Sequence, residues 1–323
     1  VLAKEAGLEL GIKESIVVND RMETSVPDIY AAGDAVQVKH YVTGNDALIS
    51  LAGPANKQGR IIADNICGGD SRYLGSQGSS VIKVFDMTAA TTGINETNAK
   101  KSGLDVDTVI LSPMSHAGYY PGGKVMTMKV VFEKESYRLL GAQIIGYEGV
   151  DKRIDVLATA IHAGLKATQL KDLDLAYAPP YSSAKDPVNM AGFMIDNIAK
   201  GTLKQWHLED MDKISKDKSV VLLDVRTVGE FNRGHMDGFR NIPVDELRER
   251  INEIEKGKPV YLICQSGLRS YIASRILEGN GYETYNFSGG FRFYDAVVND
   301  RALIERAYAC GTVSYTHLRA HET

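Results

Sequence analysis

The feature that most constrains the fold is an apolar stretch that ends on a cysteine. Residues 259–263 (Pro-Val-Tyr-Leu-Ile) are typical of a buried strand, and Cys264 follows directly. Residues 271–277 carry apolar side chains at helical spacing, so we expect a helix there. The thiol then lies where a strand ends and a short loop leads into a helix. Loop N–H groups and the helix dipole favour negative charge at such a point, and the thiolate is the nucleophilic form of cysteine.

The residues after the cysteine suit an anionic substrate. The predicted substrate loop consists of Gln265, Ser266, Gly267, Leu268 and Ser270. Within it, Arg269 adds a permanent cation with planar donors, so Cys264 and Arg269 are the predicted catalytic pair. One alternative is a buried structural cysteine in a tight turn. Another is the loop of cysteine-dependent phosphatases, in which five residues rather than these four separate Cys from Arg.

The shorter loop resembles the active site of rhodanese sulfurtransferases, and other motifs carry the same resemblance. These are the Asp-Val-Arg strand at 220–226, Glu-Phe at 230–231, a Gly-His motif at 234–239, Asn-Ile-Pro at 241–243 and a Gly-Gly turn at 287–291. Met236, Asp237 and Phe239 depart from the family pattern. The resemblance implies a rhodanese domain over residues 201–309, with sulfane sulfur carried on Cys264 as a persulfide. The predicted structural residues, which hold loops in place, are Asp224, Arg226 and His235.

Composition bounds the rest of the chain. Its 323 residues predict two domains or more. A net charge of −4 does not indicate a nucleic-acid-binding protein. No apolar run reaches the ~20 residues of a membrane-spanning helix. The cysteines at 67, 264 and 310 form neither a disulfide framework nor a metal motif. We therefore expect no metal site, no membrane or nucleic-acid partner, and a reducing cytoplasm as the compartment.

A second motif lies near the start of the chain. Residues 29–32 (Ile-Tyr-Ala-Ala) are predicted to form a short buried strand, after which Gly33 permits a tight turn. Asp34 would then lie at the carboxyl end of the strand, where open α/β sheets bind ligands. The alternative is that Asp34 caps the next helix. Residues 24–35 resemble the second FAD motif of flavoprotein disulfide reductases, which implies that Asp34 binds the ribityl chain of the flavin.

The following segment extends this resemblance. Residues 51–60 lead into a predicted helix over 61–66, and in the resembled reductases this helix start lies near the isoalloxazine. Small residues let backbone approach a ring, so Ala52 and Asn56 join Gly33 and Asp34 as predicted cofactor-binding residues. Residues 1–72 are thus expected to be the C-terminal remnant of a doubly wound FAD/NAD(P)-binding region.

Residues 73–200 have a different pattern. Strands are predicted over 81–85, 125–132 and 139–147, and an amphipathic helix over 151–163. This segment resembles the dimerisation domain of the same reductases, a β-rich domain with crossing helices. The resemblance implies a homodimer.

Two aromatic motifs narrow the resemblance. Residues 116–122 and 177–182 resemble those of coenzyme A-disulfide reductases, in which one tyrosine from each motif reaches the partner's active-site cysteine. The matching positions are Tyr119 and Tyr177, which would hydrogen-bond a thiolate or protonate a leaving thiol. The alternative is that both tyrosines only pack at an interface. No His-Pro occurs, which counts against the branch with two cysteines and a catalytic histidine.

Both ends of the sequence have unusual features. No Gly-x-Gly-x-x-Gly occurs, so the NAD(P)H site and the flavin-proximal cysteine are expected upstream of Val1, in about two hundred further residues. Residues 313–323 lack periodicity and resemble a translated sequencing adapter, so we exclude them from the fold.

Together these observations predict an α/β and α+β multidomain protein. It would combine the remnant of a doubly wound FAD domain, the dimerisation domain and an α/β rhodanese domain with a parallel sheet. The predicted function is FAD-dependent, NAD(P)H-driven reduction of coenzyme A disulfide, coenzyme A persulfide or polysulfide, with coenzyme A as substrate moiety. The alternatives are a water-forming NADH oxidase, which needs no Cys264, and a rhodanese module that only docks a sulfur carrier.

Overall fold

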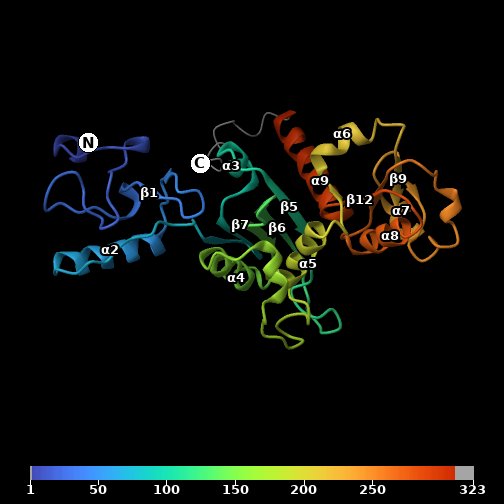
Figure 1. Ribbon diagram of the computed structural model, residues 1–323, viewed down its shortest axis with the longest axis horizontal. Helices are drawn as coiled ribbons and strands as arrows, with labels where there is room; N and C mark the ends of the chain where they lie inside the picture. Colours follow the sequence, from blue (N-terminus) through green and yellow to red (C-terminus); the bar gives the residue numbers. More distant parts are fainter. Residues whose placement is uncertain (1, 310–323) are drawn as a thin grey trace. The chain divides into compact units, whose positions relative to one another are not determined.

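The computed structural model describes residues 2–309, and side chains up to residue 303. The predicted tail at 313–323 and Cys310 lie outside the described residues. The chain divides into two compact units. The first comprises residues up to 108 together with 114–193, and the second comprises 109–113 and the chain from 194 onward. Each unit is described by itself (Figure 1).

The first 72 residues form little regular structure apart from one long helix. The elements are α1 (Leu2–Glu5), the antiparallel pair β1 (Val38–Lys39) and β2 (Asp46–Ala47), α2 (Ala52–Ile66) and 3-10 turns at Ile12–Glu14 and Gly33–Ala35. Buried Met22, Val36 and Val38 make a small core. Helix α2 begins nine residues before the predicted start, because Pro54 is tolerated in a first helical turn.

The predicted strand over 29–32 is wrong. Within it only Tyr30 makes a bridge, to Glu23, and no ladder follows on either side. A strand is stable only when a neighbour pairs with it over several residues, and the described part of the chain supplies a single bridge here. The turn at Gly33 does form, with a φ of 76° that suits glycine.

An antiparallel sheet lies within residues 80–146, and its strand at residues 106–111 crosses the boundary between the two units at residue 109. Its strands are β3 (Ser80–Val84), β4 (Met87–Gly93), β5 (Val106–Leu111), β6 (Met126–Glu133) and β7 (Leu139–Gly146), in the order β3-β4-β7-β6-β5. Helix α4 (Val150–His162) packs on β4 and β7, with Ile154, Leu157 and Ile161 buried. The predicted strands 81–85, 125–132 and 139–147 and the helix 151–163 are confirmed within two residues, whereas β4 and β5 were not predicted. The remaining elements are α3 (Glu96–Lys101), a 3-10 turn at Ala167–Asp172 and α5 (Pro187–Ala199).

The second unit contains a parallel sheet. Its strands are β8 (Gln205–Trp206), β9 (Val221–Asp224), β10 (Arg240–Asn241), β11 (Val260–Ile263) and β12 (Thr284–Phe287), in the order β10-β9-β11-β12-β8. All four pairings are parallel. The helices are α6 (Met211–Ile214), α7 (Val228–Arg233), α8 (Leu268–Glu278) and α9 (Gly290–Ala309), with 3-10 turns at Leu208–Asp210 and Ile251–Glu253.

Both faces of this sheet are buried, as a parallel sheet requires. Val260 and Leu262 of β11 pack into one apolar cluster, and Ile263 packs into the other, which contains Trp206. Strand β11 lies third of five, so its carboxyl end emerges in the middle of one sheet edge. Open α/β sheets bind ligands at this edge. Among the described residues, no helix combines the length and the apolar character needed to cross a bilayer.

Candidate active site

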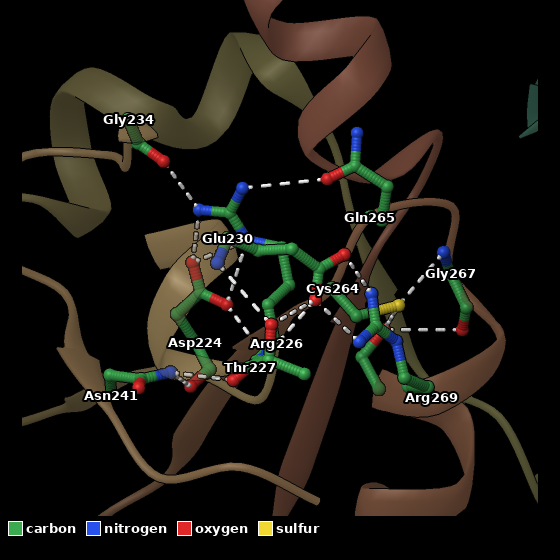
Figure 2. Close-up of polar contacts among 11 residues, drawn as sticks. Asp224, Arg226, Thr227, Glu230, Gly234, Asn241, Cys264, Gln265, Gly267 and Arg269 are labelled. Atoms are coloured by element: carbon green, nitrogen blue, oxygen red, sulfur yellow. Dashed lines mark hydrogen bonds and ion pairs between the residues drawn. The ribbon is translucent and has the colours of Figure 1, made fainter. Parts of the chain in front are cut away.

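Cys264 lies at the carboxyl end of β11 and is 1% exposed. Its Sγ accepts a hydrogen bond from the Gly267 N–H at 3.1 Å and lies 3.2 Å from the Ser270 hydroxyl (Figure 2). The Ser270 hydroxyl also lies 3.1 Å from the Gly267 carbonyl, so it is shared between the sulfur and the loop backbone.

Helix α8 begins earlier than the sequence predicts, at Leu268 rather than 271. Gly267 has a φ of 100°, a conformation that suits glycine, and it ends the loop at this point. Leu268, Arg269 and Ser270 therefore occupy the first helical turn. Only Gln265, Ser266 and Gly267 form the loop proper.

The segment after β12 fixes the shape of this loop. The N–H groups of residues 291–292 donate to the carbonyls of Cys264 at 2.8 Å and Gln265 at 3.1 Å. Gly290 lies so close that an added Cβ would come within 2.7 Å of the Ser266 Cα. The Gly-Gly turn is thus a contact surface for the cysteine loop.

Arg269 makes a bidentate ion pair that the sequence did not predict. Its two Nη atoms lie 2.7 Å from the two carboxylate oxygens of Glu230. The pair is partly exposed, by 31% for Arg269 and 21% for Glu230. The hydrogen bonds from Arg269 lower the pKa of Glu230 to about 2. Glu230 also accepts the Thr227 N–H in a capping box at the start of α7. This capping box already explains a glutamate at position 230, so the sequence contained no separate indication of its ion pair with Arg269.

Asp224 and Arg226 form a buried ion pair beside the loop. The Arg226 Nη2 lies 2.6 Å from Asp224 and donates to the carbonyl of Gly234 at 2.8 Å. The guanidinium also stacks over the ring of Phe291, 3.8 Å from its centroid. These contacts hold loops together, as the sequence analysis expects of Asp224 and Arg226. His235 is exposed and stacks on Phe231 with ring centroids 3.9 Å apart.

The structure brings the two predicted tyrosines together in the first unit. The hydroxyls of Tyr119 and Tyr177 are 2.6 Å apart, and both side chains are exposed. This hydrogen bond raises the pKa of Tyr177. A cavity of about 600 Å³ lies beside Tyr177 and is also lined by His116, Lys152 and Arg153.

A buried ion pair between Arg153 and Asp186, which the sequence did not predict, contacts residues within or next to both tyrosine motifs. Arg153 Nη2 lies 3.0 Å from Asp186 and donates to the carbonyl of Ser115 at 2.9 Å. Asp186 also accepts the Ser182 hydroxyl at 2.7 Å. The sequence does contain one indication of this pair. Arg153 falls on the buried face of an amphipathic helix, where an arginine is found only when a charged partner accompanies it.

The predicted cofactor residues lie around one turn. The Gly33 N–H donates to the side chain of Gln58 in α2 at 2.7 Å, which ties the Gly33–Asp34 turn to the helix. Asp34, Ala52 and Asn56 are exposed. Gln58 is buried and was not predicted.

Three family models match successive parts of the chain. Residues 1–59 match pyridine nucleotide-disulphide oxidoreductase, residues 79–187 match the dimerisation domain of that family, and residues 207–296 match the rhodanese-like domain. The predicted combination of a β-rich dimerisation domain with a parallel-sheet rhodanese domain is confirmed, and the structure shows the dimerisation sheet to be antiparallel.

Curated relatives match more than half of the chain. The NAD(P)H sulfur oxidoreductase (CoA-dependent) of Pyrococcus furiosus is 40% identical over 187 residues, which are 58% of this chain and 42% of that protein. A coenzyme A disulfide reductase of Staphylococcus aureus is 37% identical over 191 residues, 59% of this chain and 43% of that one. The chain thus spans less than half the length of these relatives.

Solved structures match nearly the whole chain. Reduced Bacillus anthracis CoADR-RHD superposes with a TM-score of 0.90 at 48% identity, covering 93% of this chain and 54% of that one. An NAD-dependent persulfide reductase from A. fulgidus gives 0.83 at 42% identity, covering 91% and 54%. The chain belongs to the pyridine nucleotide-disulphide oxidoreductase family, and in it the dimerisation domain is followed by a rhodanese-like domain.

Proposed function

We propose that the whole protein reduces coenzyme A persulfide, coenzyme A disulfide or polysulfide with electrons from NAD(P)H, and that Cys264 carries the sulfane sulfur. The observation that carries this proposal is the Cys264 sulfur with its two donors, in a chain that also has a reductase dimerisation domain. The relatives named for sulfur and coenzyme A disulfide reduction support the substrate class.

Sulfur transfer at this loop requires no cofactor. The Cys264 thiolate attacks the terminal sulfur of an organic persulfide R–S–SH. A new S–S bond forms at Cys264, the old S–S bond breaks, and R–S⁻ leaves with the electron pair. Gly267 and Ser270 hold the reacting Cys264 sulfur through their N–H and hydroxyl groups.

The residues around Gly33 fit FAD, the cofactor that the family implies. Asp34 is an exposed acceptor for a ribityl hydroxyl, and the small residues at the start of α2 leave room for the flavin. The bond from Gly33 to Gln58 holds the turn against that helix. When bound, FAD supplies the transfer of electrons from NAD(P)H to the sulfur substrate.

We further propose a homodimer in which Tyr119 and Tyr177 act at the partner's reductase site. Their hydroxyls lie 2.6 Å apart, so one can donate to a substrate thiolate while the other supports it. The matching dimerisation domain supports this arrangement.

A water-forming NADH oxidase is the weaker candidate. Such an enzyme from Lactobacillus brevis superposes with a TM-score of 0.58 at 26% identity and covers 61% of this chain. That reaction leaves the Cys264 loop without a use. The buried Cys264 sulfur with its contacts from Gly267 and Ser270 therefore supports sulfur chemistry.

The test uses the full-length protein from its native coding sequence. We expect NAD(P)H-dependent sulfide release from coenzyme A persulfide, and loss of sulfur transfer from thiosulfate to cyanide in Cys264→Ser. The matched control is Cys67→Ser, since Cys67 is an exposed free cysteine outside the loop. Sulfur transfer that survives in Cys264→Ser would contradict the assignment, and NADH-driven oxygen consumption without sulfide release would favour the oxidase.

A further inference from the structure

The charge beside the Cys264 loop is balanced rather than positive. Arg269 is held in a bidentate pair with Glu230, and Arg226 is held by Asp224. Arg226 and Arg269, two guanidinium groups beside the loop, thus each carry a carboxylate partner (Figure 2). Because the pKa of Glu230 is about 2, its negative charge persists throughout the neutral range.

Glu230 is close enough to affect a donor at the thiol. Arg269 interacts electrostatically with Cys264 as well as with Glu230, so one guanidinium is near both the carboxylate and the sulfur. A small dianion that approaches Cys264 meets an arginine that already donates two of its five N–H groups to Glu230. It also meets the repulsion of the carboxylate paired with that arginine.

An apolar side chain is exposed beside this ion pair. Leu268, directly before Arg269, is 66% exposed at the start of α8. An exposed leucine beside a neutral ion pair suits an organic chain better than a compact, strongly hydrated dianion.

We propose that Glu230 is a specificity-determining residue that disfavours small dianionic sulfur donors, such as thiosulfate, relative to organic persulfides. This inference rests on the proposed sulfur-transfer function of Cys264. With thiosulfate, the thiolate attacks the sulfane sulfur, a Cys–S–S bond forms, and sulfite leaves with the electron pair of the broken S–S bond. With an organic persulfide, the leaving group is R–S⁻.

Glu230→Gln isolates the charge. The glutamine oxygen still accepts the Thr227 N–H, so the capping box at α7 is kept. Removing one negative charge about 6 Å from a dianion raises affinity about ten-fold in water. A singly charged persulfide gains only about three-fold by the same reasoning.

The experiment measures kcat/KM with cyanide as acceptor and two donors, thiosulfate and β-mercaptoethanol persulfide. For Glu230→Gln we expect a gain of about ten-fold for thiosulfate, mainly in KM, that shrinks at high salt. The persulfide should gain at most about three-fold. Glu283→Gln is the matched control, because Glu283 forms an exposed pair with Lys204 in the same unit. Adding Arg269→Ala to Glu230→Gln should remove the thiosulfate gain.

The outcomes separate this inference from the proposed function. If the unmutated protein transfers sulfur but Glu230→Gln does not change the ratio of kcat/KM for thiosulfate to kcat/KM for the persulfide, only the proposed role of Glu230 is rejected. A parent that transfers sulfur from neither donor overturns the proposed function and the inference with it. Fluorescence of Trp206, the single tryptophan, reports whether each variant keeps the fold of this unit.

Discussion

Single side chains decide how the sulfur of Cys264 differs from that of Cys67. Cys67 is exposed at the end of α2, whereas Cys264 is buried and receives two donors. The two sulfurs therefore differ both in their exposure to solvent and in the polar groups that contact them.

Ser270→Ala tests this directly. The substitution removes the hydroxyl 3.2 Å from Sγ, and losing one such hydrogen bond is worth about 1 kcal/mol, or about five-fold in sulfur-transfer kcat/KM. Ser274→Ala is the control, because its hydroxyl bonds to the Tyr271 carbonyl one turn further along α8. Equal rates in the two variants would show that the hydroxyl does not support the sulfur.

Glu230 also makes stability depend on pH. Its folded pKa is lowered from 4.5 to about 2 by Arg269, so its stabilising contribution is present above pH 4.5 and is lost as the pH falls toward 2. Partial exposure limits this contribution to about 1–2 kcal/mol.

We therefore expect Glu230→Gln to be less stable than the parent at pH 6, with a difference that shrinks at pH 3.5. Urea unfolding followed by Trp206 fluorescence measures both values. A difference that stays constant between these pH values would contradict the charge-based origin.

The sequence indicated the candidate residues whose partners are close to them along the chain. It did not indicate those whose partners are many positions away. Cys264 and the loop up to Ser270 are readable because strand, glycine and helix follow one another within a few residues. Glu230 lies 39 positions before Arg269, and its capping box already gives it a local reason to be there. Arg153 and Asp186 pair across 33 positions and only the fold brings them together.

At the scale of elements, amphipathic segments were predicted well and strands without a partner were not. Helix α4 and strands β6 and β7 have strong apolar periodicity and lie where expected. The segment 29–32 has strand-like residues, but a strand depends on its neighbour as much as on its own side chains. Strand β4 (Met-Thr-Ala-Ala-Thr-Thr-Gly) has small side chains that give little signal.

The contact between the Gly-Gly turn and the cysteine loop is an element-level feature. Gly290→Ala should displace Ser266, lower sulfur transfer and destabilise this unit by more than the 1–2 kcal/mol of backbone strain. Gly281→Ala is the matched control, since Gly281 has a similar φ of 82° and open space around it. Activity and urea midpoint should fall together in Gly290→Ala, and unchanged activity would show that the loop tolerates the displacement.

For the whole molecule, the proposed role of Tyr119 and Tyr177 connects catalysis with assembly of the dimer. Tyr119→Phe and Tyr177→Phe keep the rings and should leave the proposed dimer intact, while reduction of coenzyme A persulfide slows by about ten-fold or more. Sedimentation and stopped-flow kinetics on the full-length protein measure the two properties. Tyr181→Phe, in the same motif, is the control and should be silent. Unchanged rates in the Tyr119/Tyr177 double variant would leave these side chains with a packing role.

The order of the chain has a consequence for how the protein is made. The residues that fix the cysteine loop, 290–292, follow it by more than a full helix and strand. During synthesis the thiol emerges first, in a chain that cannot yet hold the loop in shape. The loop that holds Cys264 can therefore reach its described shape only after residues 290–292 have been made and have packed against it.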